Sequence, residues 1–117
     1  MSFLYENLDV YKKSIQLADE LTETTELFPK GKYYLKDQLN RACISIFLNI
    51  AEGNGRFHTK DKMHFFYISR GSACECAALV DMCFRKQLVE EKKAVEYRQR
   101  LNDICRMLSG LINRFKE

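Results

Sequence analysis

Residues 94–115 read AVEYRQRLNDICRMLSGLINRF, and this stretch decides the fold. Its apolar residues alternate spacings of three and four, as Ala94, Tyr97, Leu101, Ile104, Leu108, Leu111 and Phe115. Cys105 and Ile112 widen the same stripe. A helix with this heptad order buries one face along a partner, as helices do in a bundle. The stretch therefore predicts a long amphipathic helix packed against other helices.

Three further helices are predicted upstream. The first covers about 8–27 and is stopped by Pro29 and Gly31; the second covers 33–52; the third begins with Thr59 as its N-cap and reaches about 86. The second carries the core series Leu35, Leu39, Ala42, Cys43, Ile46 and Ile50. Short connections place successive helices antiparallel. We therefore predict an all-α fold, an antiparallel up-and-down four-helix bundle spanning 1–117 as a single domain.

The composition is that of an ordered globular protein, with 46% hydrophobic and 30% charged residues. Five cysteines without a secretory leader predict a cytoplasmic protein in a reducing compartment. The most apolar segment, 63–84, contains Arg70, Glu75 and Asp81, which argues against membrane insertion. The net charge of +3 permits RNA as a partner without arguing for it.

The second and third helices carry more apolar surface than one bundle needs. The additional residues are Ile44, Phe47, Leu48 and Ala51 in the second helix, and Phe65, Phe66, Tyr67, Met82 and Phe84 in the third. A helix that is apolar all round is buried all round, so we predict a homo-oligomer with contacts made chiefly by these two helices. Scattered exposed apolar residues, which are common on monomers, are the alternative.

The segment Asn49–Arg56, NIAEGNGR, ends the apolar run of the second helix. Gly53 is predicted to be a left-handed C′ cap, and Asn49 and Glu52 are predicted to hold the following loop. Gly53 to Arg56 before a helix start also resembles an anion cradle. The spacing does not fit a Walker loop, and no strand precedes the glycines. A structural turn, with Gly53 and Gly55 at positive φ, is favoured over a phosphate site.

Arg41 stands in an apolar run, where an unpaired charge is costly. Antiparallel counting brings it within reach of Glu75, so we hypothesise an Arg41–Glu75 ion pair, within or between subunits.

Cys74 and Cys76, two apart on a helix, point to nearly opposite sides and cannot share a metal ion. We therefore predict no metal, cofactor or catalytic residue, and expect no small-molecule substrate.

Basic and aromatic residues gather at the two ends of the second helix. One cluster is Phe28, Lys30, Lys32, Tyr33, Tyr34 and Lys36; the other is Arg56, Phe57, His58, Lys60 and Lys62. A solvated end of mixed charge is the simpler interpretation, unless a ring repeats the second cluster around an axis. In that case Arg56, His58, Lys60 and Lys62 are the candidate nucleic-acid-binding residues.

The residues together resemble the 23S rRNA-intervening-sequence protein family over nearly the whole chain. The resemblance rests on Leu8-Asp9-Val10-Tyr11, Ala18, Phe28-Pro29, Gln38 to Ile46, Asn49 to Gly53, Gly55-Arg56, Asp61, Phe65, Gly71-Ser72 and Glu75. Asn40 departs from the pattern where a second arginine is common, and Phe47-Leu48 where smaller residues or proline are frequent. A more distant resemblance is to the accessory protein of diversity-generating retroelements.

The family resemblance implies a bundle assembled as a ring, typically a pentamer, without known enzymatic activity and with suspected RNA binding. Three functional hypotheses follow. The leading one is a non-enzymatic ring that binds structured RNA or a ribonucleoprotein. The second is a protein-interaction or scaffolding module that makes no direct contact with nucleic acid. An enzyme is the third, because the sequence offers no set of paired titratable groups.

Overall fold

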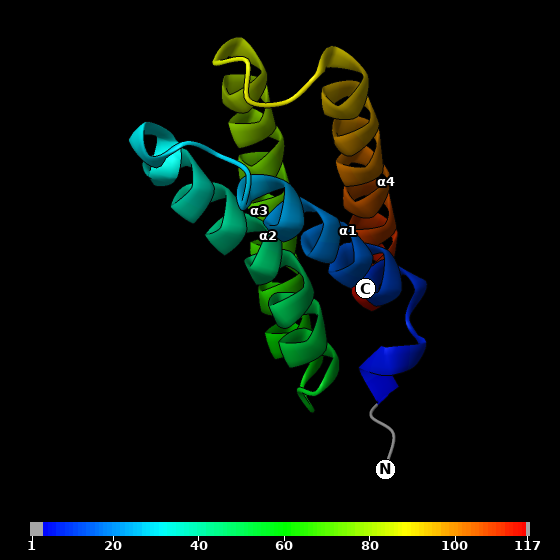
Figure 1. Ribbon diagram of the computed structural model, residues 1–117. Helices are drawn as coiled ribbons and strands as arrows, with labels where there is room; N and C mark the ends of the chain where they lie inside the picture. Colours follow the sequence, from blue (N-terminus) through cyan, green and yellow to red (C-terminus); the bar gives the residue numbers. More distant parts are fainter. Residues whose placement is uncertain (1–3, 117) are drawn as a thin grey trace.

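The computed structural model describes residues 4–116, and this part of the chain contains helices and no strand. The elements are η1 (Leu4–Asn7), α1 (Asp9–Thr25), η2 (Lys30–Lys32), α2 (Tyr33–Asn54), α3 (Thr59–Arg85) and α4 (Glu91–Phe115) (Figure 1). The prediction of an all-α fold with four long helices is confirmed. None of these helices is long and apolar enough to cross a membrane.

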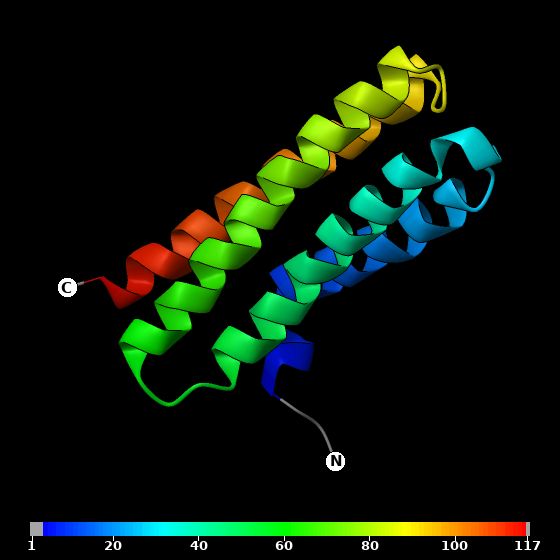
Figure 2. The same ribbon diagram turned by 90° about the vertical axis from the view of Figure 1, so that its left-hand side faces the viewer.

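The four long helices lie as two neighbouring pairs, α1 beside α2 and α3 beside α4 (Figure 2). Contacts between α2 and α3 join the pairs. The turn between α2 and α3 lies at the same end of the bundle as the start of α1 and the end of α4 (Figure 2). The turns from α1 to α2 and from α3 to α4 lie at the other end. The segment 55–58 and the start of α1 are therefore near each other.

The core is built from the predicted stripes. On α4 the buried residues are Ala94, Tyr97, Leu101, Ile104, Leu108, Leu111 and Ile112. Phe115 is half-buried, and its ring centroid lies 6.1 Å from that of Phe66. The predicted core series of α2 is buried throughout. Cys43, which belongs to the predicted core series, and Cys76 and Cys83 are buried free thiols that serve as small apolar residues.

Small polar side chains hold α2 against α3. Ser69 Oγ, which is fully buried, donates a hydrogen bond to the backbone oxygen of Ile46 at 2.7 Å. The hydroxyls of Ser45 and Ser72 lie 2.8 Å apart and share a hydrogen bond. Serine side chains are short, so the two helices can approach closely while their buried polar groups remain paired. This close approach determines which residues fit at the end of α2.

The first and last helices are joined by a bidentate ion pair. The Arg100 guanidinium donates to both carboxylate oxygens of Glu20 at 2.8 Å each, and Thr24 and Tyr97 share a hydrogen bond of 2.9 Å one turn away. The hydrogen bonds from Arg100 lower the pKa of Glu20, although burial acts in the opposite direction. Parallel N–H···O bonds of this kind are the strongest geometry for an arginine and a carboxylate.

This ion pair makes stability depend on pH. A carboxyl group with a lowered folded-state pKa stabilises the fold above its unfolded pKa, and that contribution is lost as pH falls through the folded value. We expect Glu20→Gln to lower the free energy of unfolding at neutral pH, and the difference from the unmodified chain to shrink below about pH 4.5. Denaturant titrations from neutral pH to below about pH 4.5 measure this difference in the free energy of unfolding, with Glu23→Gln as an exposed control on the same helix. If the difference in stability between Glu20→Gln and the unmodified chain does not change with pH, the Glu20–Arg100 ion pair is not its cause.

The end of α1 differs from the prediction, whereas α3 ends at Arg85, close to the predicted residue 86. The backbone N–H groups of Glu26, Leu27 and Phe28 bond to carbonyls three residues back, so α1 ends at Thr25 and Phe28 turns into the core. At the end of α3, Gln87 adopts φ 61°, and the N–H of Leu88 bonds to the oxygen of Cys83. The second arrangement is a Schellman motif with glutamine where glycine is usual.

Candidate nucleic-acid interface

The turn between α2 and α3 is short and tied to the helix before it. Asn54 is the last residue of α2, and the N–H of Gly55 donates to the oxygens of Ala51 and Glu52. The N–H of Arg56 donates to the oxygen of Gly53 at 3.2 Å. These amides are occupied within the chain, so they do not form the anion cradle that the glycine pattern suggested. The structure supports the alternative, a structural turn.

The predicted role of Gly53 as a left-handed cap is wrong. Gly53 lies inside α2 and is buried, and no glycine in residues 4–116 has a positive φ, which removes the same prediction for Gly55. A Cβ atom at Gly53 would lie 2.8 Å from Cε1 of Phe66 and 3.0 Å from Cβ of Phe65. Glycine is therefore present because α3 passes too close for a side chain.

Asn49 and Glu52 were both predicted to hold the loop, but only Glu52 does so. The Asn49 amide nitrogen donates to the backbone oxygen of Ser45 at 2.8 Å and to its hydroxyl at 3.0 Å, so it points back along α2. The Glu52 carboxylate forms an ion pair of 2.9 Å with Arg56. The predicted N-cap, Thr59, is instead the first residue of α3; His58 precedes it and makes no side-chain cap bond.

Two of the four candidate basic residues have structural contacts in the turn. Besides its pair with Glu52, the Arg56 guanidinium lies over the ring of Phe65, 4.6 Å from the centroid. The Lys62 ammonium donates to the backbone oxygen of Asn54 at 3.0 Å, which satisfies a carbonyl at the end of α2. Both residues bring positive charge to this end of the bundle while holding the turn in place.

The other two candidates, His58 and Lys60, are exposed, and they flank the start of α3. Beside them Phe57 has 90% of its surface exposed, with its ring centroid 5.1 Å from that of His58. Sequence reasoning placed Phe57 in the basic cluster but did not choose it as a site residue. Its signal was an aromatic residue between two basic ones in a glycine-containing turn.

Residues of η1 line one side of a surface hollow next to the α2–α3 turn, and the sequence did not predict this contribution. A surface hollow of about 500 Å³ is lined by side chains and backbone from η1 and the turn: Leu4, Tyr5, Asn54, Gly55, Arg56, Phe57 and Lys62. An exposed aromatic ring, cationic groups and a hollow thus occur together at the end of the bundle that carries the α2–α3 turn.

Arg41 and Glu75 are both exposed. The ion pairs within residues 4–116 do not include one between them, so the version of this hypothesis within one chain is not realised. Asn40 is used structurally, because it accepts a hydrogen bond of 2.8 Å from Thr25. The version of the hypothesis in which the pair forms between subunits stays a prediction.

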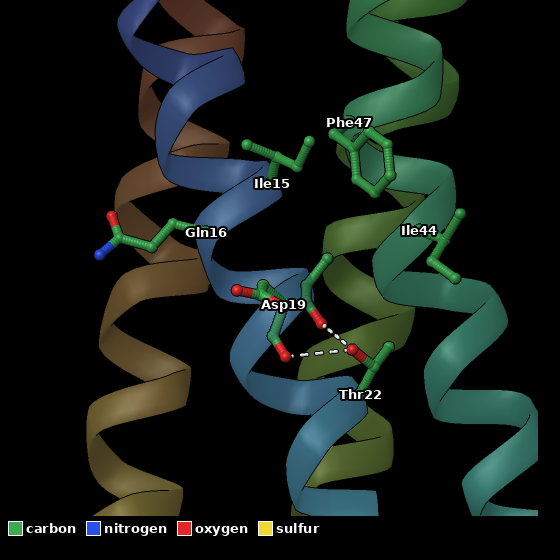
Figure 3. A pocket seen from close by; sticks show the side chains of 7 residues that line it. Ile15, Gln16, Asp19, Thr22, Ile44 and Phe47 are labelled. Atoms are coloured by element: carbon green, nitrogen blue, oxygen red, sulfur yellow. Dashed lines mark hydrogen bonds between the residues drawn. The ribbon is translucent and has the colours of Figure 1, made fainter.

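A second hollow is an open apolar groove of about 550 Å³ between α1 and α2 (Figure 3). Its walls are Ile15 from α1 and Ile44 and Phe47 from α2. Thr22 borders it but bonds back to the oxygens of Ala18 and Asp19, so its hydroxyl is already satisfied. The groove therefore offers mainly apolar surface.

In the described part of the chain, no three histidine, cysteine or acidic side chains come together as a metal site would require. Burial raises the pKa of the Cys43 and Cys83 thiols to about 11, and raises that of Cys76 further. These thiols are protonated at neutral pH, which suits their place in the core.

Comparison with known proteins agrees with this architecture. The family model of the 23S rRNA-intervening sequence protein matches residues 6–110. The chain is similar in structure to a protein with unknown function from the S23 ribosomal protein family of Bacteroides thetaiotaomicron, with a TM-score of 0.83 and 18% identity over 89% of this chain and 95% of that one. A search of curated proteins gave no match. The chain therefore belongs to the 23S rRNA-intervening sequence protein family.

Proposed function

We propose that the chain is the protomer of a cytoplasmic homo-oligomeric ring, and that the ring binds structured RNA or a ribonucleoprotein through its α2–α3 turns. The observation that carries the proposal is the exposed Phe57 between Arg56 and His58, with Lys60 beside it. The role is one of binding, and assigns no catalytic residue, cofactor or small-molecule substrate. The family name, which refers to an intervening sequence of 23S rRNA, supports RNA as the class of ligand.

The chemistry of the turn suits unpaired RNA loops. Exposed aromatic side chains stack on splayed bases, at about 1 to 3 kcal/mol per base, and cationic side chains contact the backbone phosphates. Lys60 lies in the first turn of α3, where the helix dipole also favours an anion. Phe57 would therefore stack on a base while His58 and Lys60 contact the adjoining phosphates.

A single turn is a small site, and assembly would multiply it. In the proposed protomer the helices follow an up-and-down, antiparallel course, which places every α2–α3 turn at one end of the molecule. A ring then repeats the turn around one rim, and several weak contacts with the same RNA act together. The family resemblance implies a pentamer as the ring size.

We expect Lys60→Glu to weaken RNA binding at least tenfold at low salt, because it reverses a charge at the rim. Lys60 stands where an acidic residue suits the helix dipole, so the fold should be retained. Fluorescence anisotropy with a labelled hairpin RNA, repeated across salt concentrations, measures the affinity and the salt slope. The slope should become shallower by about one for each RNA phosphate that the variant ring no longer neutralises.

The matched control is Lys30→Glu, which makes the same charge change at the opposite end of α2. A second variant, Phe57→Ser, should reduce affinity while leaving the salt slope unchanged, because stacking releases no counterions. If Lys60→Glu and Lys30→Glu lose the same RNA affinity, the effect is one of overall charge, and the proposed site at the rim is contradicted. No RNA affinity at low salt would reject the proposal altogether.

A protein-interaction or scaffolding role is the second candidate, and the apolar groove between α1 and α2 favours it. In this role the groove captures a partner helix and the basic turn only adds solubility. This role would be supported over RNA binding by a protein partner that binds without RNA. Such a partner should still bind Lys60→Glu but should not bind Ile44→Lys.

A further inference from the structure

Cys74 on α3 and Cys105 on α4 lie at the same level of the bundle. One turn away along the interface, Arg70 Nη1 donates to Ser109 Oγ at 2.9 Å. Cys74 follows Arg70 by four residues, and Cys105 precedes Ser109 by four. Residues four apart share a helix face, so in helices that run in opposite directions this register brings the two cysteines together.

A second contact on the other side of the cysteines fixes the same register. Asp81 of α3 is bonded to Arg98 of α4. Cys74 precedes Asp81 by seven residues and Cys105 follows Arg98 by seven, again a spacing that keeps one face. Burial raises the pKa of the Cys105 thiol, and the neighbouring Cys74 thiol raises it further. They therefore face each other across the α3–α4 interface, between two polar contacts that hold its alignment.

The two thiols differ in access. Cys74 is exposed, whereas Cys105 is half-buried, and its burial raises its pKa to about 11. Cys43, Cys76 and Cys83 are buried. Thiol reactivity follows exposure and thiolate character, so a reagent in solution reaches Cys74 first. Cys105 is placed to react next, inside the protein.

We propose that Cys74 and Cys105 form a reversible disulfide that ties α3 to α4 when the protein meets a low-molecular-weight disulfide of the glutathione type. The Cys74 thiolate attacks one sulfur of the small disulfide and releases one small thiolate, leaving a mixed disulfide on Cys74. The Cys105 thiolate then attacks the Cys74 sulfur and releases the second small thiolate. Two protein thiols are oxidised, one small disulfide is reduced to two thiols, and the released thiolates take up the two cysteine protons.

This modification would act on the bundle and not on the RNA-binding turn. The new bond would close a loop that contains the end of α3, the Gln87 turn and the first half of α4. Closing such a loop restricts the unfolded chain, so the oxidised protein should resist denaturant better than the reduced one. The site thus gives the fold a stability that depends on the thiol redox state, independently of any RNA.

The experiment uses the full chain and oxidised glutathione as the probe. After exposure and alkylation of remaining thiols, trypsin digestion should yield peptide 71–85 linked to peptide 101–106. Because 71–85 also contains Cys76 and Cys83, fragment ions and the Cys74→Ser variant assign the bond. The unfolding midpoint in urea should rise on oxidation and return after reduction. Cys105→Ser should instead accumulate a glutathione adduct on Cys74, and its unfolding midpoint in urea should not rise on oxidation.

Each outcome decides the proposal. A linked peptide that persists in Cys74→Ser would assign the bond to another cysteine and overturn it. Unmodified thiols, a stable glutathione adduct on Cys74 of the unaltered chain, or a Cys74–Cys74 bond between two copies on a non-reducing gel would also overturn it. Both cysteines lie at the surface or half-buried, so folding of the two serine variants is expected, and the unaltered chain supplies the decisive mass in any case.

Discussion

Gly53→Ala lowers the free energy of unfolding by about 2 kcal/mol, although alanine is the better helix former by about 1 kcal/mol. The added Cβ would lie 2.8 Å from Cε1 of Phe66 and 3.0 Å from its Cδ1. Phe66 is 1% exposed, so its ring has no free space into which to move. Overpacking therefore outweighs the gain in helix propensity. Denaturant unfolding at fixed protein concentration measures the loss.

The control is Gly110→Ala, in α4, where an added Cβ meets nothing within 4 Å. This change should raise stability by about 0.5 to 1 kcal/mol. A double variant with Phe66→Leu tests the cause: the loss from Gly53→Ala should be smaller when the ring is absent. If Gly53→Ala stabilises the protein as Gly110→Ala does, the close approach of α3 is not significant in solution.

Gly53 also shows where sequence reasoning reaches its limit. A glycine after an apolar helical series fits a left-handed cap and a close helix contact equally well, because both need the absence of a side chain. The choice depends on Phe66, which belongs to another helix. By contrast, most of the stripe on α4 was predictable, since its signal is a local period; of the predicted residues only Cys105 and Phe115 are half-buried and not buried.

For the candidate interface too, some features could be predicted from the sequence and others depend on tertiary structure. Charges close together in the chain identified the α2–α3 turn, but they did not show that Arg56 pairs with Glu52 or that Lys62 bonds to Asn54. These contacts depend on the course of the turn. The position of Cys74 opposite Cys105 depends on the register of two helices, which no local pattern specifies. The sequence therefore predicted the turn as the candidate interface, and only the tertiary structure shows which of its residues have contacts within the chain.

Leu48→Lys should dissociate the proposed ring into monomers of 13.8 kDa. Leu48 projects from α2 with 54% of its surface exposed, and Ile44 of the apolar groove lies one turn away on the same helix. A lysine there would be buried in the assembled state, and the carboxylate of Glu52, four residues on, is already paired with Arg56. The unpaired charge would cost roughly 3 to 5 kcal/mol per interface, or a hundredfold or more in the dissociation constant. Sedimentation velocity at micromolar concentration measures the mass.

Val95→Lys is a close control, because Val95 is 58% exposed on α4 and, like Leu48, has a glutamate four residues away. It should leave the assembly intact, since the ring is expected to use α2 and α3. Dissociation by both variants would mean that added charge, and not the position, breaks the ring. A monomeric unaltered chain would remove the ring and would leave the α2–α3 turn as an isolated weak site. Assembly is therefore the first measurement to make, because the RNA proposal depends on repeated turns.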